Sequence, residues 1–478
     1  MKYQQYDLIV VGTGFAATFF LKKYLEKRKE ARVLVLERGT LFSFVDRLQQ
    51  KKGKNPDYAQ SLTGYKDCIA NHNDDKPWVF DPNFGGSSNC WWAVTLRFMP
   101  NDFKIKSTYG VGLDWPIGYQ DVENYYTEAE EIMAIAGPDL TPFVRNGPYP
   151  QPPHALSTVD KVLQKEYGAN YFSQPSARAS KSIKQRGTCC ASYVCSLCPV
   201  NAKFTIENSL MEVYKDERVE LLYNAQVYSL LLERNVVRKV QFKHNGKDTE
   251  AEGEIVALGA NAIFNAHILL AAGDANPLTG KGITEQRGFF ANVHLKDFDN
   301  VGGGSAMSAN GYMLYEGAFR SEAASCLIEN HNGPFIRNEF GKWRHMARFK
   351  FVLEDLIDER NKVSLSDDPL KPLIEFKGHN SYIERGRELV IKKMDALFSC
   401  LPVEEIFPDG NYQNTESHIL SSVRMGHSAE DSVVDHKQIH HQYRNLFVLG
   451  GSSFPSITAA NPTLTISALS LRSADLSF

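Results

Sequence analysis

The sequence has no excess of charge of either sign. It contains 53 lysine and arginine residues against 56 aspartate and glutamate residues, a formal net charge of −3 over 478 residues. Binding to a phosphate backbone needs clustered cationic charge, so nucleic acid is not expected as a main partner. Charged residues make up 23% and hydrophobic residues 43%, values of ordinary globular proteins that exclude a disordered or fibrous chain.

Long apolar runs are also lacking. The longest candidate, residues 255–272, is interrupted by glycine, asparagine and histidine, so we expect no membrane-spanning helix. Residues 1–6 are polar, and the apolar run that follows leads into a glycine loop instead of a cleavage site. We therefore expect no secretory leader and, on that ground, a cytoplasmic location.

Cysteine is scarce, with eight residues, and it is unevenly placed. Four of the eight fall within ten positions, at Cys189, Cys190, Cys195 and Cys198. A disulfide framework would be spread along the chain and normally accompanies secretion. The clustering therefore favours a metal or redox site.

The N-terminal residues have the pattern of a βαβ unit. Residues 6–11 predict a buried strand, residues 18–29 a helix and residues 32–36 a second strand. The intervening loop reads G-x-G-x-x-A from Gly12, which permits a tight turn and a close approach of the backbone to a pyrophosphate at the helix N-terminus. Glu37, at the end of the second strand, can accept hydrogen bonds from a ribose diol. The unit predicts a dinucleotide site without separating FAD from NAD.

Three further segments carry a family resemblance. Residues 83–92 (NFGGSSNCWW) form a second glycine–serine loop, residues 114–130 begin with DWPIGY, and residues 445–475 contain NPTLT. Together with the N-terminal loop they closely resemble the glucose–methanol–choline (GMC) oxidoreductases, FAD-dependent alcohol oxidases and dehydrogenases. Gly450-Gly451 resembles the pyranose oxidases, and the cysteine cluster resembles the catalytic subunits of bacterial FAD-dependent glucose, gluconate and fructose dehydrogenases.

The resemblance implies an α/β fold (α+β overall), in which a Rossmann-like FAD-binding domain is interleaved with a substrate domain built on an antiparallel sheet with helices. We expect the FAD-binding domain at residues 1–102, 202–275 and 414–478. The substrate-binding domain would take residues 103–201, with the cysteine cluster, and 276–413. The alternation of residues 348–354 and the pattern of 361–366 predict strands in the substrate domain.

The resemblance also implies the cofactor-binding residues. Strand 219–228, which contains Val227, resembles the family strand that meets the adenine, and strand 255–260 resembles the one that closes over the dinucleotide. The expected FAD contacts are Gly12, Gly14, Phe15, Ala16, Glu37, Arg38, Gly85, Gly86, Ser87, Ser88, Asn89, Cys90, Val227, Gly259, Gly451, Ser452, Asn461, Pro462 and Thr463.

Alcohol oxidation by a flavin needs a base that is unprotonated near neutral pH, which favours histidine. The family places its catalytic histidine at the start of an H-x-x-G-T-x-R-M-G segment, and His418 takes that position here, with Ser421-Ser422 in place of Gly-Thr. His427 is the main competitor. The partner position falls on Asn461, which would orient the substrate hydroxyl. A helix over residues 463–472 would direct its N-terminal dipole at the flavin.

Cys90 stands at or next to the place where pyranose oxidases carry a histidine bonded covalently to the flavin. A flavin–cysteine link is one interpretation of this residue. The alternative is a small buried cysteine packed beside the ring.

The cysteine cluster has the spacing C-C-x4-C-x2-C, followed by proline. Three thiolates within ten residues can hold an iron–sulfur cluster, and the resembling dehydrogenases carry a three-iron (3Fe-4S) cluster on a similar stretch with one residue more. The expected ligands are Cys189 or Cys190 with Cys195 and Cys198. Zinc, a disulfide and inert buried cysteines are the alternatives.

The sequence thus predicts FAD-dependent oxidation of a sugar or other alcohol, with electrons passed through an iron–sulfur cluster to an external acceptor. The alternatives are an oxidase that uses O₂ and a non-catalytic electron-transfer flavoprotein. The resemblance implies a small partner subunit, sometimes with a cytochrome. Because such a partner carries the export signal, a periplasmic location by co-export is also compatible with the sequence.

Overall fold

The computed structural model describes residues 5–51, 65–73 and 75–478, so the first four residues of the polar N-terminus lie outside it. A five-stranded parallel sheet runs in the order β17-β9-β1-β2-β5. Its strands are β1 (Tyr6–Val11), β2 (Val33–Leu36), β5 (Val219–Leu222), β9 (Gly253–Leu258) and β17 (Leu446–Val448). Strands β1 and β2 and the C-terminal half of β9 are almost fully buried and mostly aliphatic, as expected for a parallel sheet covered on both faces.

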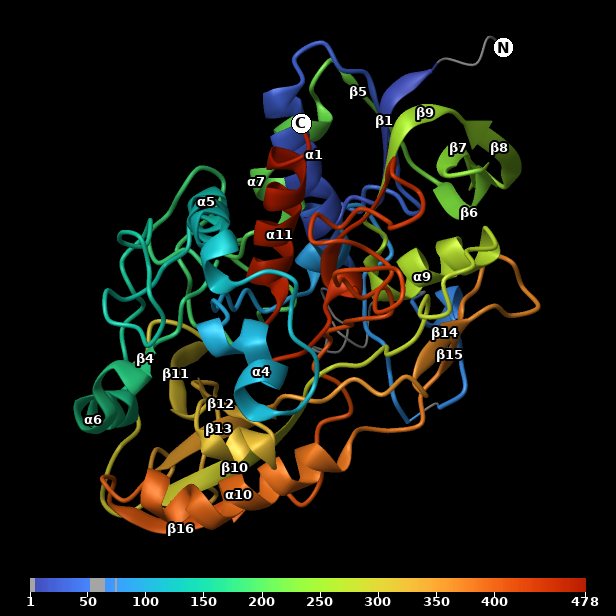
Figure 1. Cartoon of the computed structure of the whole chain (residues 1–478). Coiled ribbons are helices and arrows are strands. Elements are labelled where there is room, and N and C mark those ends of the chain that lie inside the picture. The colour runs from blue at the N-terminus through green and yellow to red at the C-terminus, as the bar shows by residue number, and fades with distance from the viewer. Residues whose placement is uncertain (1–4, 52–64, 74) are drawn as a thin grey trace.

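Helices from opposite ends of the chain pack beside this sheet. Helix α1 (Phe15–Lys27) contacts the C-terminal helix α11 (Thr463–Asp475), and α5 (Glu123–Met133) packs against α11 (Figure 1). Helix α9 (Asn261–Ala271) follows β9 directly. The parallel sheet and its helices are therefore assembled from segments that are hundreds of residues apart.

A second sheet is antiparallel and has six strands, in the order β16-β10-β13-β12-β11-β4. The strands are β4 (Tyr171–Ser173), β10 (Arg287–Leu295), β11 (Met307–Leu314), β12 (Cys326–His331), β13 (Met346–Leu353) and β16 (Val403–Pro408). Helix α10 (Ser381–Leu397) covers one face of this sheet (Figure 1), where a separate core includes Phe289, Phe351, Val390 and Met394. The opposite face is left for the site described below.

Two small sheets complete the structure. One contains β6 (Ala225–Glu233), β7 (Val236–His244) and β8 (Lys247–Ala251), and the other contains β3 (Ala70–Asn71), β14 (Lys362–Ser364) and β15 (Leu373–Glu375). The remaining helices of the described chain are α2 (Phe44–Lys51), α4 (Ile105–Tyr109), α6 (Thr158–Tyr167), α7 (Ile206–Ser209) and α8 (Met211–Tyr214), besides short 3₁₀ turns. Among all the described helices, none combines the length and the hydropathy that a membrane crossing requires.

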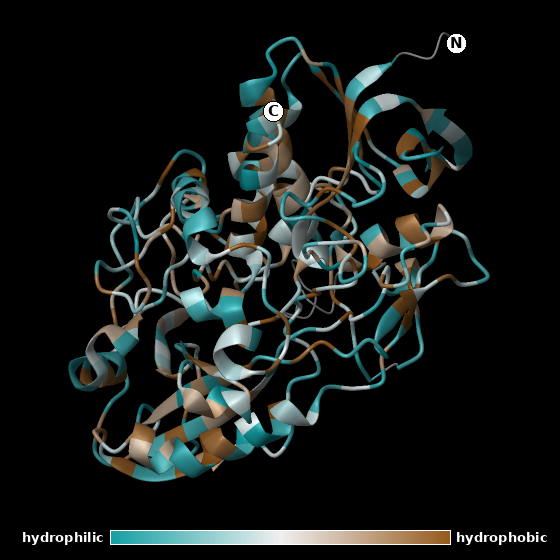
Figure 2. Ribbon diagram, viewed as in Figure 1, coloured by the Kyte–Doolittle hydropathy of each residue, from teal (hydrophilic) through white to brown (hydrophobic). Residues whose placement is uncertain are grey.

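The predicted fold class is confirmed, with one strand corrected. The single strand expected over 219–228 is two strands in different sheets, because Asn224 adopts φ +51° and turns the chain between β5 and β6. The strand predicted at 348–354 is β13 in the antiparallel sheet, whereas the one at 361–366 is β14 in a small sheet. In Figure 2 hydrophobic colour concentrates on interior strands and helices, and the outer loops are mostly polar.

The strands of the two large sheets come from alternating parts of the chain. The parallel sheet uses β1 and β2, then β5 and β9, then β17, and the antiparallel sheet uses β4, then β10, β11, β12 and β13, then β16. This arrangement agrees with an interleaved pair of domains. The residue boundaries of those domains stay a prediction.

Candidate active site

A cavity of about 670 Å³ lies between the carboxyl edge of the parallel sheet and the free face of the antiparallel sheet. Loops that follow β1, β2, β9 and β17 form one end of it. Residues of β10, β12 and β13 form the other end. In open α/β sheets ligands bind outside the carboxyl ends of the strands, so the first end is the expected dinucleotide site.

The glycine loop after β1 makes the dinucleotide end. Gly12 has φ +91°, and a Cβ there would lie 2.9 Å from the Gly259 carbonyl oxygen, so both the turn and the packing require glycine. A Cβ on Gly14 would meet no protein atom within 4 Å, which leaves its backbone open towards the cavity. A Cβ on Gly86 would approach the Gly14 Cα to 3.2 Å, so the second glycine loop closes directly over the first.

Glu37 lies in the cavity wall at the end of β2 and is buried. Its carboxylate accepts hydrogen bonds from the Thr13 hydroxyl at 2.6 Å and from the Gly39 N–H at 2.8 Å. Burial raises the pKa of Glu37, and these two hydrogen bonds oppose the rise. The side chain is thereby held in one orientation, with lone pairs left for a ribose hydroxyl.

Most of the predicted cofactor-binding residues line the cavity. They are Gly12, Gly14, Phe15, Ala16, Glu37, Arg38, Gly86, Ser87, Cys90, Val227, Gly259, Gly451, Asn461, Pro462 and Thr463. Four do not: Gly85, Ser88, Asn89 and Ser452.

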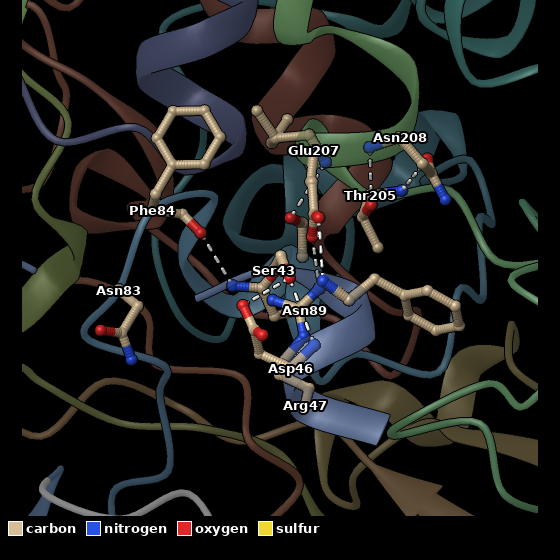
Figure 3. A network of polar contacts seen from close by, with 12 residues as sticks. Ser43, Asp46, Arg47, Asn83, Phe84, Asn89, Thr205, Glu207 and Asn208 are labelled. Carbon is tan, nitrogen blue, oxygen red and sulfur yellow. Dashed lines mark hydrogen bonds and ion pairs between the residues drawn. The ribbon is translucent and has the colours of Figure 1, made fainter. Parts of the chain in front are cut away.

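These four residues support the wall from behind. The Gly85 N–H donates to the Thr13 hydroxyl, and the Ser88 hydroxyl accepts from the Ile206 N–H. The Asn89 amide donates to Asp81. It also donates to the Phe84 carbonyl (Figure 3). Ser452 donates to the Leu449 carbonyl. For Ser88 and Asn89 the short 3₁₀ turn Gly86–Asn89 explains the difference, because its successive side chains point in different directions.

Cys90 lies in the cavity wall, as the sequence predicts. Burial raises the pKa of its thiol to about 12, so the sulfur is protonated at neutral pH. A neutral thiol is a poor nucleophile. This environment favours the packed cysteine over the flavin–cysteine link.

His418 lies in the same wall, and its protonation is set by Gln286, a residue that the sequence did not single out. The Gln286 amide nitrogen donates to the carbonyl oxygens of Thr458 at 2.8 Å and Ala460 at 3.0 Å. The amide oxygen is left to accept from Nδ1 of His418, at 3.0 Å. Nδ1 therefore carries the proton and Nε2 is the free base. Burial lowers the pKa of His418 to about 4, so the imidazole is neutral at pH 7.

The loop around His418 is held in an unusual backbone conformation. Ser417, Ser421 and Ser422 have φ of +60°, +64° and +88°, a region that costs energy for residues other than glycine. The Ser421 hydroxyl donates to the Phe454 carbonyl at 2.8 Å, and that of Ser422 donates to the Ala262 carbonyl at 2.6 Å. These bonds show how two serines replace the Gly-Thr of the resembling segment. His427, the competing histidine, is exposed and outside the cavity.

Asn461 enters the cavity immediately before α11. Its side-chain oxygen is buried and has no hydrogen-bond partner among the described residues. Pro462 and Thr463 also line the cavity, so the N-terminus of α11 faces the site. The positive end of the helix dipole favours negative charge at that point.

The other end of the cavity carries charged residues that sequence reasoning missed. Glu329 of β12 pairs with Lys350 of β13, and Lys350 pairs with Phe290 of β10. All three line the cavity together with His331 and Glu416. Only the register between distant strands brings them together, so local sequence patterns carry no signal for this group.

Comparisons with known proteins agree with this geometry. A sequence model of the GMC oxidoreductase family matches residues 358–470. The chain is 28% identical over 435 residues to the fructose dehydrogenase large subunit of Gluconobacter japonicus, a match that covers 82% of this chain and 79% of the relative. The chain thus matches the GMC oxidoreductase family over its C-terminal part and is similar in sequence to a dehydrogenase subunit over most of its length.

Further comparisons cover almost the whole length of the chain. It is 24% identical over 517 residues to the 6'''-hydroxyparomomycin C oxidase of Streptomyces lividus, covering 98% of this chain and 90% of the relative. The crystal structure of pyridoxine 4-oxidase from Mesorbium loti superposes with a TM-score of 0.69 over 99% of both chains, at 16% identity. The latter similarity establishes the fold.

The cysteine loop, residues 189–198, lies next to the cavity. Tyr193, within the loop, lines the cavity, and its hydroxyl lies 2.6 Å from Nδ1 of His331. Cys195 is buried, Cys189 and Cys198 are partly buried and Cys190 is exposed, and all four are free thiols.

Three of these thiols are close enough to influence one another. The pKa of Cys195 is raised to about 11, mainly by burial and in smaller part by the neighbouring Cys189 and Cys198. Even so, the described residues contain no group of three or more cysteine, histidine, aspartate or glutamate side chains arranged to hold a metal ion. The thiols as placed do not fit an iron–sulfur cluster, so no step of the reaction is derived through one.

Proposed function

We propose that this chain oxidises a secondary or primary alcohol of a sugar or related compound, with His418 as the base. The observation that carries the proposal is the hydrogen bond from Nδ1 of His418 to Gln286. It leaves Nε2 unprotonated inside a cavity whose opposite end has the features of a dinucleotide site. The curated relatives are named as oxidases and dehydrogenases, which supports this chemistry.

FAD, when bound, supplies the hydride acceptor, and the chain supplies the remaining functions. The glycine loops would hold the pyrophosphate, Glu37 would hold the ribose, and the N-terminus of α11 would favour negative charge on the ring. His418 takes the hydroxyl proton at Nε2. Asn461 orients the hydroxyl through its side-chain amide, whose oxygen has no partner among the described residues.

The test is anaerobic reduction of the flavin by candidate alcohols, which is measured as the loss of the absorbance of the oxidised flavin. We expect the wild type to be reduced by at least one sugar or polyol. His418→Ala should keep its FAD but lose the reaction by roughly 100-fold or more, the usual size of a general-base contribution. His427→Ala is the matched control and should react normally. An active His418→Ala variant would remove His418 from this role.

We further propose that the electrons leave this enzyme to an external acceptor, as in a dehydrogenase. The support is the similarity to the fructose dehydrogenase large subunit and the position of the cysteine loop beside the cavity. An iron–sulfur cluster (3Fe-4S) on Cys195 and Cys198 with Cys189 or Cys190, together with a small partner subunit or a cytochrome, belongs to the same proposal. The cluster is proposed from the spacing of the four cysteines in the sequence.

Iron and acid-labile sulfide assays on anaerobically purified protein test the cluster. Stoichiometric iron and sulfide would support it, whereas zinc or no metal would reject it. Oxygen electrode measurements separate the oxidase alternative, because an oxidase would consume O₂ and form peroxide at the rate of substrate oxidation.

A further inference from the structure

One wall of the cavity presents a row of three charged residues, Glu329, Lys350 and Glu416, that the chemistry above does not use. Two of them come from adjacent strands of the antiparallel sheet, Glu329 on β12 and Lys350 on β13, which are direct cross-strand partners. Such partners have Cβ atoms about 4.5–5.5 Å apart on the same face of a sheet. Their neighbours in sequence, Ile328, Phe349 and Phe351, face the core under α10. The alternation of the strands therefore directs Glu329 and Lys350 to the cavity.

Glu329 has an unsatisfied acceptor in this wall. Its residue is 3% exposed, and its Oε1 atom has no hydrogen-bond partner among the described residues. The other oxygen lies 3.5 Å from Nε2 of His331, and no described lysine or arginine forms an ion pair with this carboxylate. Leaving a buried acceptor unpaired costs roughly 1–3 kcal/mol, and more for a charged group. A ligand that donates a hydrogen bond here would remove that cost.

Lys350 provides the complementary donor. Its ammonium is held by Oε2 of Glu416 at 2.5 Å, and its side chain is 14% exposed. A Cβ on Gly288 would lie 2.4 Å from Oε1 of Glu416 and 2.9 Å from Cε of Lys350, so glycine on β10 leaves the room that this pair occupies. Glu416 therefore positions Lys350, whose remaining N–H groups are available to a ligand oxygen.

This row lies beside the proposed base. Glu416 precedes His418 by two residues in the same loop. Burial is the main cause that lowers the pKa of His418, and the charges of Lys350 and Glu329 also act on it. Groups of the substrate that contact the row are thus close to the hydroxyl that is oxidised.

A hydroxyl group both donates and accepts a hydrogen bond, so neighbouring hydroxyls match an adjacent carboxylate and ammonium. We propose that Glu329 and Lys350 bind hydroxyl groups next to the reacting one and make the enzyme selective for polyhydroxylated substrates over monohydric alcohols. Glu416 acts as a positioning residue for Lys350. This inference rests on the proposed function.

The charges of the row argue against charged substrates. Glu329 and Glu416 would repel a substrate carboxylate. A substrate ammonium group is not needed either, because Lys350 already provides a positive charge beside these carboxylates. A neutral polyol satisfies the unpaired acceptor without adding charge to a buried site.

The experiment measures flavin reduction under anaerobic conditions by stopped-flow, with propan-1-ol, propane-1,2-diol, glycerol, D-sorbitol and D-glucose as neutral probes. D-Glucosamine and D-gluconate are the cationic and anionic probes. For wild type, the ratio of limiting rate to apparent Kd should be highest for a neutral polyol. In Glu329→Gln the apparent Kd of that polyol should rise about tenfold, the equivalent of one hydrogen bond to a charged group, while the values for propan-1-ol change less than about twofold.

Two further variants keep the result interpretable. Glu388→Gln, on the exposed side of α10, makes the same chemical change on the far side of the sheet and should behave as wild type. If Glu329→Gln fails to fold or to retain FAD, Lys350→Met takes its place, and the ratio of limiting rate to apparent Kd is measured for that variant.

The outcomes are distinct. If none of the probes reduces the flavin of the wild type, the proposed function is overturned, and this inference falls with it. If the flavin of the wild type is reduced, but the variants lose reduction by all the alcohols equally or by none of them, the inference is overturned and the proposed function stands. Preference of the wild type for D-glucosamine or D-gluconate, lost in the variants, also overturns it in favour of a charged substrate.

Discussion

His418, the proposed base, owes its protonation state to its neighbours. Gln286 fixes the proton on Nδ1, and burial keeps the ring neutral. The amide of Gln286 is itself held by two backbone carbonyl oxygens, so its orientation follows from the hydrogen-bond network. A histidine in water would titrate between pH 6 and 7, close to the working pH of most enzymes.

The first prediction concerns the pH dependence of flavin reduction. A protonated imidazole cannot accept the hydroxyl proton, so activity is lost as the pH falls through the pKa of His418. Since burial lowers that pKa to about 4, the limiting rate should stay level near neutral pH and decline only below about pH 5. Anaerobic stopped-flow across a pH series, at saturating substrate, measures this. A decline centred near 6.5 would show that His418 is not shielded from water.

The second prediction tests the role of Gln286. In Gln286→Glu a carboxylate faces Nδ1, which stabilises the imidazolium and raises the pKa of His418. The acid limb should therefore move to higher pH by one unit or more, with a partial recovery of rate in alkaline buffer. Gln120→Glu, at an exposed site, is the control. A merely structural defect would instead lower the rate by the same factor at every pH.

At the scale of elements, two loops meet at one buried lysine. The ammonium of Lys203 donates to the carbonyl oxygens of Asn89 at 2.8 Å, Trp91 at 3.1 Å and Ser196 at 3.0 Å. The first two belong to the loop that closes over the dinucleotide site, and the third belongs to the cysteine loop. Lys203 thus holds the loop over the dinucleotide site at a fixed distance from the cysteine loop.

The third prediction follows from this link. Lys203→Met keeps the length of the side chain but leaves three carbonyl oxygens without their donor. We expect unfolding to become easier by about 2 kcal/mol, FAD to be retained less well, and Cys195 to react faster with a thiol reagent. The exposed Lys181→Met variant is the control. Unchanged thiol reactivity in Lys203→Met would mean that the loops are held together without it.

At the scale of the molecule, the cavity is built from parts that are far apart in the chain. Its wall includes residues near Gly12, Gly86, Gly259, Glu329 and Asn461. A ligand that fills it contacts both large sheets together. Binding to the folded state alone stabilises it, by about 2.7 kcal/mol when the free ligand is at 100 times its Kd.

The fourth prediction concerns the stability of the whole enzyme. Removal of FAD should lower the melting temperature by several degrees, and added FAD should restore it in a concentration-dependent way. NAD at the same concentration should have little effect, which also settles the choice of cofactor that the glycine pattern left open. Calorimetry of the deflavinated protein makes the measurement. Equal stabilisation by NAD would contradict the assignment of FAD.

Local patterns accounted for the N-terminal part of the fold, and the family resemblance supplied the principal site residues. The strand, glycine loop and Glu37 follow from spacing within about 30 residues, and Gly12 has the positive φ that its position required. His418 and Asn461 were found by resemblance, and the structure places both in the cavity. Side-chain direction was less predictable: Ser88 and Asn89 turn away from the cavity because a 3₁₀ turn orients each residue differently.

By itself the sequence determined the βαβ unit, because that unit depends on periodicity and on backbone conformations that few residues adopt. The family resemblance of its motifs supplied the two-sheet class of the fold and the candidate residues for proton and hydroxyl chemistry. The tertiary structure alone decided which tautomer His418 holds, that Glu329 and Lys350 share the cavity wall, and that the cysteine loop lies beside that wall. These features depend on strand register and on contacts across hundreds of residues. Packing of the whole chain sets that register, and no local pattern records it.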